Sequence, residues 1–518
     1  MTEMEWAKPM LVADFLENSA RQRTNKVALI CDGRRLTYAM IDSMANRMAN
    51  ALCDGGVMPG DRVLLFLPNS VELVVAIFAV LKAGGVFVVV NASTKLGKLL
   101  FLARNCRATA LVTEARKTEL AATAMAETPS LLSTILTGDP RNLVDDRDGR
   151  FVLFDQIQRD YPETCPPCPR QPEDLACLIY TSGSTGEPKG VMSTHSNVAF
   201  AASSIIRYLE NRGNDILINV LPLSFDYGLY QLLMTFKFGG TLVLERSFAF
   251  PTVVLQRMEA ERVTGFPGVP TIFAVLLRMD LSNYDLSSLR YITNTAAALP
   301  ASHIQQIQKL FPWARLYSMY GLTETKRTLY LPPEQLNARP GSVGIAIPGT
   351  EVWLEDENGR RLGPYQTGEL VISGPHVMQG YWENPEATAR RYRMGPDGRR
   401  VCYSGDLFYM DDDGYMYFVG RKDDIIKSRG EKVAPKEIEN VLYALPGVSE
   451  VAVIGVPDNV LGQAIKAIIV KDGSPLDEMT VLRHCRSHLE DFMVPQTIEF
   501  RHSLPKTSSG KIRKAALS

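Results

Sequence analysis

A loop rich in glycine, hydroxyl groups and one lysine directly follows an apolar run in this chain. The run is residues 175–180, and the loop reads TSGSTGEPKG over residues 181–190. Glycines let backbone N–H groups point into a shared concavity, while hydroxyls and a lysine add donors and positive charge. The order Gly-x-x-x-x-Gly-Lys-Ser/Thr of the usual P-loop is absent. A flexible Ser/Gly linker is the alternative, but such linkers seldom follow an apolar strand. The pattern therefore predicts a polyphosphate site. Its candidate residues are Thr181, Ser182, Gly183, Ser184, Thr185, Gly186 and Lys189.

Four more motifs lie downstream of this loop. They read YGLTE at 320–324, SGD at 404–406, GRKDDIIK at 420–427 and PKTSSGKIR at 505–513. In order and spacing, the five together resemble the adenylate-forming superfamily, which includes acyl-CoA synthetases, adenylation domains of nonribosomal peptide synthetases and firefly luciferase. The resemblance covers nearly the whole chain. It implies an AMP-forming ligase that activates an acid with ATP and Mg²⁺ as an acyl adenylate, then transfers the acyl group to a pantetheine thiol.

The resemblance also assigns roles in nucleotide binding. Glu324 would bind Mg²⁺, because one carboxylate plus phosphate oxygens is the usual arrangement for this cation. Thr323 would contact phosphate, and Asp406 would accept hydrogen bonds from the ribose diol. Taken singly, Glu324 is typical of a solvated surface carboxylate and Asp406 of a turn aspartate. The remaining nucleotide contacts are expected from Tyr320 and Arg421.

Lys511 lies in a Gly-Lys segment at the C-terminal end of the chain. A lysine delivered by a mobile lid could stabilise charge between the carboxylate and the α-phosphate only while the lid is closed. The alternative is a plain basic tail, since Lys506 and Arg513 are close by. By resemblance, the lid would rotate about Lys422, and its other face would bring Gly430 to the thiol path.

His195 matches a histidine that the family places near the acyl and thiol path. Its alternative role is a structural hydrogen bond at the start of a helix, and both remain open from the sequence.

Phe225 and Asp226 resemble the Phe-Asp pair of amino-acid adenylation domains. A carboxylate in an apolar pocket is costly to bury without a cationic partner, and a substrate ammonium would supply one. The alternative is that Asp226 caps the following helix. Thr295 and Ala296 match the segment that flanks the adenine and the acyl pocket.

Lys326 and Arg327 replace the small neutral residues that commonly follow the Thr-Glu of this family. They could bind a second carboxylate of the substrate, or else serve the ATP phosphates or a local salt bridge. The segment resembles free-standing enzymes that activate β-amino acids for polyketide assembly lines, and also acyl ligases of bacterial surface-polysaccharide systems.

The leading hypothesis is therefore an amino acid or β-amino acid loaded on a stand-alone carrier protein. The alternatives are an acyl-CoA ligase for an aliphatic or aromatic carboxylic acid, and a non-catalytic nucleotide-binding protein on the same fold.

Helical and strand patterns alternate over the first part of the chain, which is typical of parallel sheets covered by helices. Short strands and turns predominate over 342–420, and a small α+β unit follows. We expect an α/β fold with a large N-terminal domain at 1–420, a β-rich subdomain at its end, and a mobile C-terminal lid at 421–518.

The overall composition is that of an ordinary soluble globular protein. Hydrophobic residues make up 46% of the 518, charged residues 22%, and the formal net charge is −1. This balance gives no electrostatic reason to expect nucleic acid or an anionic membrane as partner. The acidic start lacks the features of a signal peptide, and the apolar stretches are too short for membrane insertion. A cytoplasmic location is expected.

Overall fold

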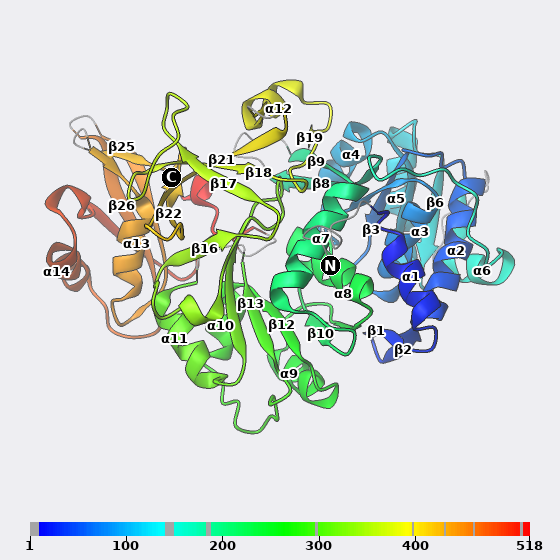
Figure 1. Cartoon of the computed structure of the whole chain (residues 1–518), viewed down its shortest axis with the longest axis horizontal. Coiled ribbons are helices and arrows are strands. Elements are labelled where there is room, and N and C mark those ends of the chain that lie inside the picture. The colour runs from blue at the N-terminus through cyan, green and yellow to red at the C-terminus, as the bar shows by residue number, and fades with distance from the viewer. Residues whose placement is uncertain are drawn as a thin grey trace.

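The computed structural model describes residues 10–139, 150–182, 188–295, 299–395, 398–428, 431–458, 461–507 and 511–517. Their strands form three sheets, of 14, eight and five strands. Figure 1 shows the two larger sheets with their helices in blue to yellow, and the smallest sheet in orange at the left. The expected α/β fold, with a large N-terminal domain and a small C-terminal one, is confirmed.

The eight-stranded sheet has the order β19-β9-β8-β4-β3-β5-β6-β7. Its strands from β8 to β7 are parallel, whereas β8 and β9 form an antiparallel hairpin and β19 pairs antiparallel with β9. The described residues of the predicted phosphate segment, Thr181, Ser182 and 188–190, thus belong to the two strands of this hairpin. The strands are β3 (Arg62–Phe66), β4 (Val86–Val89), β5 (Ala108–Glu114), β6 (Ser133–Thr137), β7 (Phe151–Leu153), β8 (Leu175–Ser182), β9 (Pro188–Thr194) and β19 (Gly380–Tyr381).

The 14-stranded sheet combines a parallel and an antiparallel half. Strands β1, β11, β10, β12, β13 and β14 are parallel. Strands β15, β16, β17, β18, β20, β21 and β22 extend the sheet antiparallel beyond β14, and β2 pairs antiparallel with β1 at the other edge. The β-rich segment is therefore continuous with the parallel sheet. The strands are β1 (Val27–Cys31), β2 (Arg34–Thr37), β10 (Ile216–Asn219), β11 (Thr241–Leu244), β12 (Gly265–Gly268), β13 (Tyr291–Asn294), β14 (Arg315–Tyr320), β15 (Leu329–Leu331), β16 (Ser342–Ala346), β17 (Glu351–Glu355), β18 (Gly368–Ser373), β20 (Tyr392–Met394), β21 (Arg400–Met410) and β22 (Met416–Arg421).

A single apolar core joins helices α1, α2, α3, α7 and α8 to both larger sheets. Helix α3 is buried at every residue except Glu72, which explains its almost continuous apolar sequence. Among the described residues, no helix has the length and apolar character needed to span a membrane. The helices of the two larger sheets are α1 (Asp14–Gln22), α2 (Tyr38–Asp54), α3 (Val71–Lys82), α4 (Leu96–Asn105), α5 (Thr118–Glu127), α6 (Phe154–Asp160), α7 (His195–Leu209), α8 (Asp226–Phe238), α9 (Pro251–Ala260), α10 (Pro270–Leu276), α11 (Ala301–Leu310) and α12 (Pro385–Arg391).

The five-stranded sheet has a hydrophobic core of its own. Its order is β24-β23-β26-β25, with β27 paired to β26. The change of sheet falls between Arg421 and Ile426, which agrees with the predicted domain boundary, although the boundary and the hinge stay predictions. The elements are β23 (Ile426–Ser428), β24 (Glu431–Val433), α13 (Pro435–Tyr443), β25 (Val448–Asp458), β26 (Gly462–Lys471), α14 (Glu478–His488) and β27 (Thr497–Arg501).

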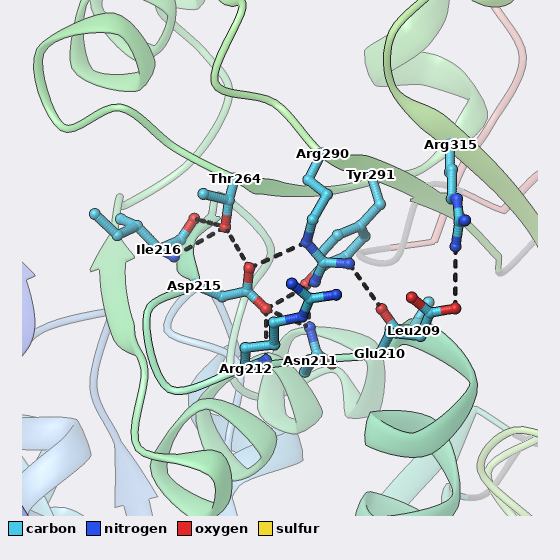
Figure 2. Close-up of polar contacts among 10 residues, drawn as sticks. All are labelled: Leu209, Glu210, Asn211, Arg212, Asp215, Ile216, Thr264, Arg290, Tyr291 and Arg315. Carbon is cyan, nitrogen blue, oxygen red and sulfur yellow. Dashed lines mark hydrogen bonds and ion pairs between the residues drawn. The ribbon is translucent and has the colours of Figure 1, made fainter.

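A polar network fixes the amino ends of three neighbouring parallel strands (Figure 2). Asp215, Thr264 and Arg290 each immediately precede one of the strands β10, β12 and β13. Asp215 is buried, and it accepts hydrogen bonds from Arg290 Nη2 at 2.7 Å and from Thr264 Oγ1 at 3.0 Å. The side-chain amide of Asn211 and the backbone N–H of Arg212 also donate hydrogen bonds to Asp215. This network holds the strand register at the edge opposite the predicted site.

Candidate active site

The predicted nucleotide residues gather at the carboxyl ends of the parallel strands, where open α/β sheets commonly bind ligands. Thr295 directly follows β13 and is buried. Tyr320 ends β14, and Thr323 lies half-buried in the turn beyond it. Ala296 lies outside the described residues.

Asp406 is the centre of a polar cluster built on two paired strands. It faces Arg421 directly across the β21–β22 pair, and Arg421 Nε lies 3.4 Å from Asp406 Oδ1. The hydroxyl of Tyr320 donates to Asp406 Oδ2 at 2.6 Å. Burial raises the pKa of Asp406, and Arg421 and Tyr320 partly offset this effect. Within the described residues Oδ1 accepts no hydrogen bond, so it remains open to a ribose hydroxyl.

Glu324 is buried, unlike the solvated carboxylate that its position alone suggests. Tyr381 of β19 donates a 2.6 Å hydrogen bond to Oε1, and Arg391 Nε lies 4.0 Å from the same oxygen. Burial acts to raise the pKa of Glu324, but Arg391 and Tyr381 outweigh it, so the pKa is lowered. Both contacts fall on Oε1. An ionised carboxylate at this position fits a Mg²⁺ ion shared with phosphate oxygens.

The hairpin of the phosphate loop is joined to Glu324 through Tyr381. Thr181 and Lys189 face each other across the β8–β9 pair, and Tyr381 pairs with the neighbouring residue Val191. Lys189 Nζ lies 5.6 Å from the centroid of the Tyr381 ring. Ser182 ends β8, whereas the predicted residues between it and Pro188 lie outside the described part. These are Gly183, Ser184, Thr185 and Gly186.

Lys511 differs from the lysines around it. Its charge acts on Asp406, where it helps to lower the pKa of the buried carboxyl group. Lys506 and Lys514 instead pair within the C-terminal domain, with Glu450 at 2.6 Å and Glu439 at 2.7 Å. The charge of Lys511 is therefore felt across the domain boundary, whereas those of Lys506 and Lys514 are paired locally, and the catalytic role of Lys511 stays a prediction.

Lys422 is held to the large domain by two contacts. Its Nζ lies 3.0 Å from Glu369 Oε2, and its backbone N–H donates to the carbonyl of Gly405. Glu369 also accepts a 2.9 Å hydrogen bond from the backbone of Gly405. Gly430, the predicted thiol-path residue, lies outside the described residues.

His195 is the first residue of α7 and is buried. Its Nδ1 accepts a 3.1 Å hydrogen bond from the backbone of Val12, and burial lowers its pKa to about 4. The imidazole is therefore neutral at physiological pH. This contact favours the structural role, and the catalytic one stays a prediction.

The Phe225–Asp226 pair does not have the surroundings that the sequence suggested. Asp226 is the first residue of α8, while Phe225 occupies the capping position, so Asp226 is not the helix cap. Asp226 is buried, and its charge acts on Lys326, which is fully buried as well. A cation of the chain itself thus acts in the same cluster as Asp226, and the role of Asp226 toward a substrate ammonium stays a prediction.

Arg327 lies close to the same helix, with its guanidinium carbon 4.4 Å from the centroid of the Tyr227 ring.

Three residues of the site were missed from the sequence: Tyr381, Arg391 and Glu369. None belongs to one of the five motifs, and each reaches the site through strand pairing or helix placement far from the motif it contacts. The aromatic pair Tyr381-Trp382 ahead of an arginine-rich helix was the one signal available.

Two family descriptions match the chain. The AMP-binding enzyme family matches residues 16–382, and the AMP-binding enzyme C-terminal domain matches residues 437–511. A feruloyl-CoA synthase of Amycolatopsis sp is 35% identical over 499 residues, covering 96% of each chain. A long-chain-fatty-acid–CoA ligase of Bacillus subtilis is 32% identical over 532 residues, covering 97% of this chain and 93% of its own.

Solved structures agree with these relatives. The anthranilate CoA ligase AuaEII, in complex with anthranoyl-AMP, has a TM-score of 0.89 at 29% identity and covers 98% of this chain and 96% of its own. The o-succinylbenzoate CoA synthetase of Bacillus subtilis, in complex with ATP and a magnesium ion, has a TM-score of 0.83 at 27% identity and covers 96% and 98%. ATP and Mg²⁺ are thus supported as cofactors. The chain belongs to the AMP-binding enzymes and is an ATP-dependent, AMP-forming ligase.

Proposed function

We propose that the chain joins a carboxylic acid to CoA through an acyl adenylate. A carboxylate oxygen attacks the α-phosphorus of ATP and pyrophosphate leaves; the thiol sulfur of CoA then attacks the acyl carbon and AMP leaves. The observation that supports this proposal is that the charge of Lys511, in the C-terminal domain, acts on the buried Asp406 of the large domain. A cation at that position can stabilise the charge that develops on the α-phosphate during the first step.

The residues of the predicted nucleotide site would act by positioning ATP and neutralising its charge. Asp406 and Tyr320 would orient the ribose, Glu324 would hold Mg²⁺ on the phosphates, and Lys189 would supply charge to them. Alignment and charge neutralisation account for most of the catalysis of phosphoryl and nucleotidyl transfer.

The acid is proposed to be aliphatic or aromatic, without an ammonium group beside Asp226. Lys326 already offsets the charge of that carboxylate, so a second cation there would be repelled. The relatives named for fatty acids and ferulate favour the same choice, and they favour CoA over a carrier protein as acceptor. The amino-acid hypothesis is therefore no longer the leading one.

The test is ATP–pyrophosphate exchange, followed by AMP and thioester formation with and without CoA. Simple carboxylic acids, amino acids and β-amino acids are supplied in separate pools. We expect exchange with simple acids, and thioester only when CoA is present. Exchange confined to amino-bearing acids, or acyl transfer only to a phosphopantetheinylated carrier protein, would overturn the proposal.

A further inference from the structure

Lys326 and Arg327 are two neighbouring cations buried in the large domain. Their side chains are 0% and 3% exposed, and within the described residues Lys326 Nζ and Arg327 Nε have no hydrogen-bond partner. A buried cation without a partner is strongly unfavourable, so such groups are usually paired or bind a ligand. These two side chains therefore require an explanation.

The charges around them do not balance. Asp226 is the acidic neighbour, and its charge acts chiefly on Lys326. The nearby carboxylate of Glu324 already has Arg391 and Tyr381 as partners. A guanidinium is a permanent cation in proteins, so Arg327 gives this cluster a positive charge for which no described residue supplies an anion.

Aromatic rings and one hydroxyl surround the excess charge. Tyr227 of α8 lies under the Arg327 guanidinium, and its own hydroxyl is bonded to Thr293. Lys326 Nζ lies 5.8 Å from the ring centroid of Tyr230, whose buried hydroxyl has no partner within the described residues. The cluster thus offers two cations and one free hydroxyl donor on one face of α8.

The turn that carries these cations is rigidly built. Lys326 adopts the left-handed backbone conformation with φ of 58°, which costs free energy in a residue other than glycine. The hydroxyls of Thr325 and Thr328 bond to each other at 2.7 Å across the turn. Gly321 lies so close to the Lys326 carbonyl that a Cβ atom there would clash with it. The backbone is therefore held where both side chains enter the cluster.

We propose that Lys326, Arg327 and the Tyr230 hydroxyl bind a second carboxylate of the substrate, which is then a dicarboxylic acid. The inference rests on the proposed CoA ligase function, because it names the acid that this site takes. A guanidinium can hold a carboxylate through two parallel hydrogen bonds, and Lys326 and Tyr230 add two further donors. The distal carboxylate balances the excess charge, while the other end of the acid reaches the ATP bound near Glu324.

The test compares α,ω-dicarboxylic acids with monocarboxylic acids of equal chain length, by kcat/KM for CoA-dependent AMP formation. We expect the wild-type chain to favour one diacid over its matched monoacid by about 10- to 100-fold, the range of one to two charged hydrogen bonds. Arg327→Met should abolish that ratio, and Arg327→Lys should restore part of it. Arg339→Met is the matched control, since Arg339 also lies over a tyrosine ring but pairs with Asp411 and Asp413.

Thermal stability in the presence of the acid alone provides a readout that does not need catalysis. The diacid should raise the Tm of the wild type and of Arg339→Met, but not that of Arg327→Met. If the proposed ligase function is wrong, no acid will be activated. The Tm shift would still show whether the cluster binds a diacid. A preference for monoacids, or an Arg327→Met variant that loses diacid and monoacid activity equally and raises the KM for ATP, would overturn it.

Discussion

Lys511 and the lysines beside it differ in their partners, and this difference is testable. Lys506 and Lys514 pair with acids of their own domain, whereas Lys511 acts on Asp406. Lys511→Ala should lower the rate of adenylate formation by about 100- to 1000-fold, the usual effect of removing one transition-state donor. Thioester formation from a supplied acyl adenylate should change far less. Lys506→Ala is the control, and an equal loss there would assign Lys511 to a general basic surface.

Arg391 and Tyr381 together keep Glu324 ionised, and Tyr381 does so by donating to Oε1 at 2.6 Å. Because the pKa of Glu324 is lowered from 4.5 in the folded chain, its contribution to stability is present above about pH 4.5 and is lost as the pH falls through the folded value. Tyr381→Phe removes a hydrogen bond to a charged group, about 1.5 kcal/mol, so the acid limb of the pH–rate profile should move up by about one pH unit.

Tyr392→Phe is the matched control for this change. The Tyr392 ring lies 5.8 Å from that of Tyr381, but its hydroxyl has no partner within the described residues. The acid limb of the pH–rate profile of Tyr392→Phe should lie at the same pH as that of the wild type. An unchanged profile in Tyr381→Phe would mean that Arg391 alone keeps Glu324 ionised.

At the scale of elements, the amino ends of β10, β12 and β13 depend on the buried Asp215 (Figure 2). Asp215→Ala leaves Arg290 and Thr264 without their acceptor, and breaking such a pair costs about 3 kcal/mol. We expect a clearly lower Tm in thermal unfolding. The exposed pair of Arg315 and Glu210 is the control, because Arg315→Ala should cost less than about 1 kcal/mol. Equal Tm values would show that the register does not depend on this network.

Local patterns predicted single elements well but not how distant elements meet. Helix α13 (Pro435–Tyr443) belongs to the α+β unit expected after residue 420, because its apolar spacing and its proline at the start are encoded locally. The pairing of β19 with β9 joins segments far apart in sequence, and no local pattern encodes it. Hence Glu324 was predicted as a metal ligand, whereas its partners Tyr381 and Arg391 were not.

The same limit explains the error at Asp226. The sequence indicated a buried carboxylate at this position, but its cationic partner was expected to be an ammonium group of the substrate. Lys326 was identified separately in another motif, and only the fold brings the two charges together. A buried charge predicts that a partner exists, but it does not say which part of the system supplies it.

At the scale of the whole molecule, the contacts that hold the C-terminal domain keep Lys511 where its charge acts on Asp406. Glu369 connects the two sides of the predicted hinge. One oxygen accepts from the backbone of Gly405, and the other lies 3.0 Å from Lys422 Nζ. Both contacts favour the arrangement that is suited to adenylate formation, and rotation about Lys422 would break the ion pair.

Glu369→Gln should therefore weaken the hold on this arrangement and slow adenylate formation without slowing thioester formation. The Lys422 side chain is half exposed, so the ion pair is worth at most about 1 kcal/mol, which corresponds to a change of about fivefold. We expect slower adenylate formation and unchanged or faster thioester formation in single-turnover measurements. Glu351→Gln removes a comparable exposed pair with Arg361 in the same sheet and should alter neither step. If Glu369→Gln slows both steps equally, Glu369 supports the site generally and does not bias the position of the C-terminal domain.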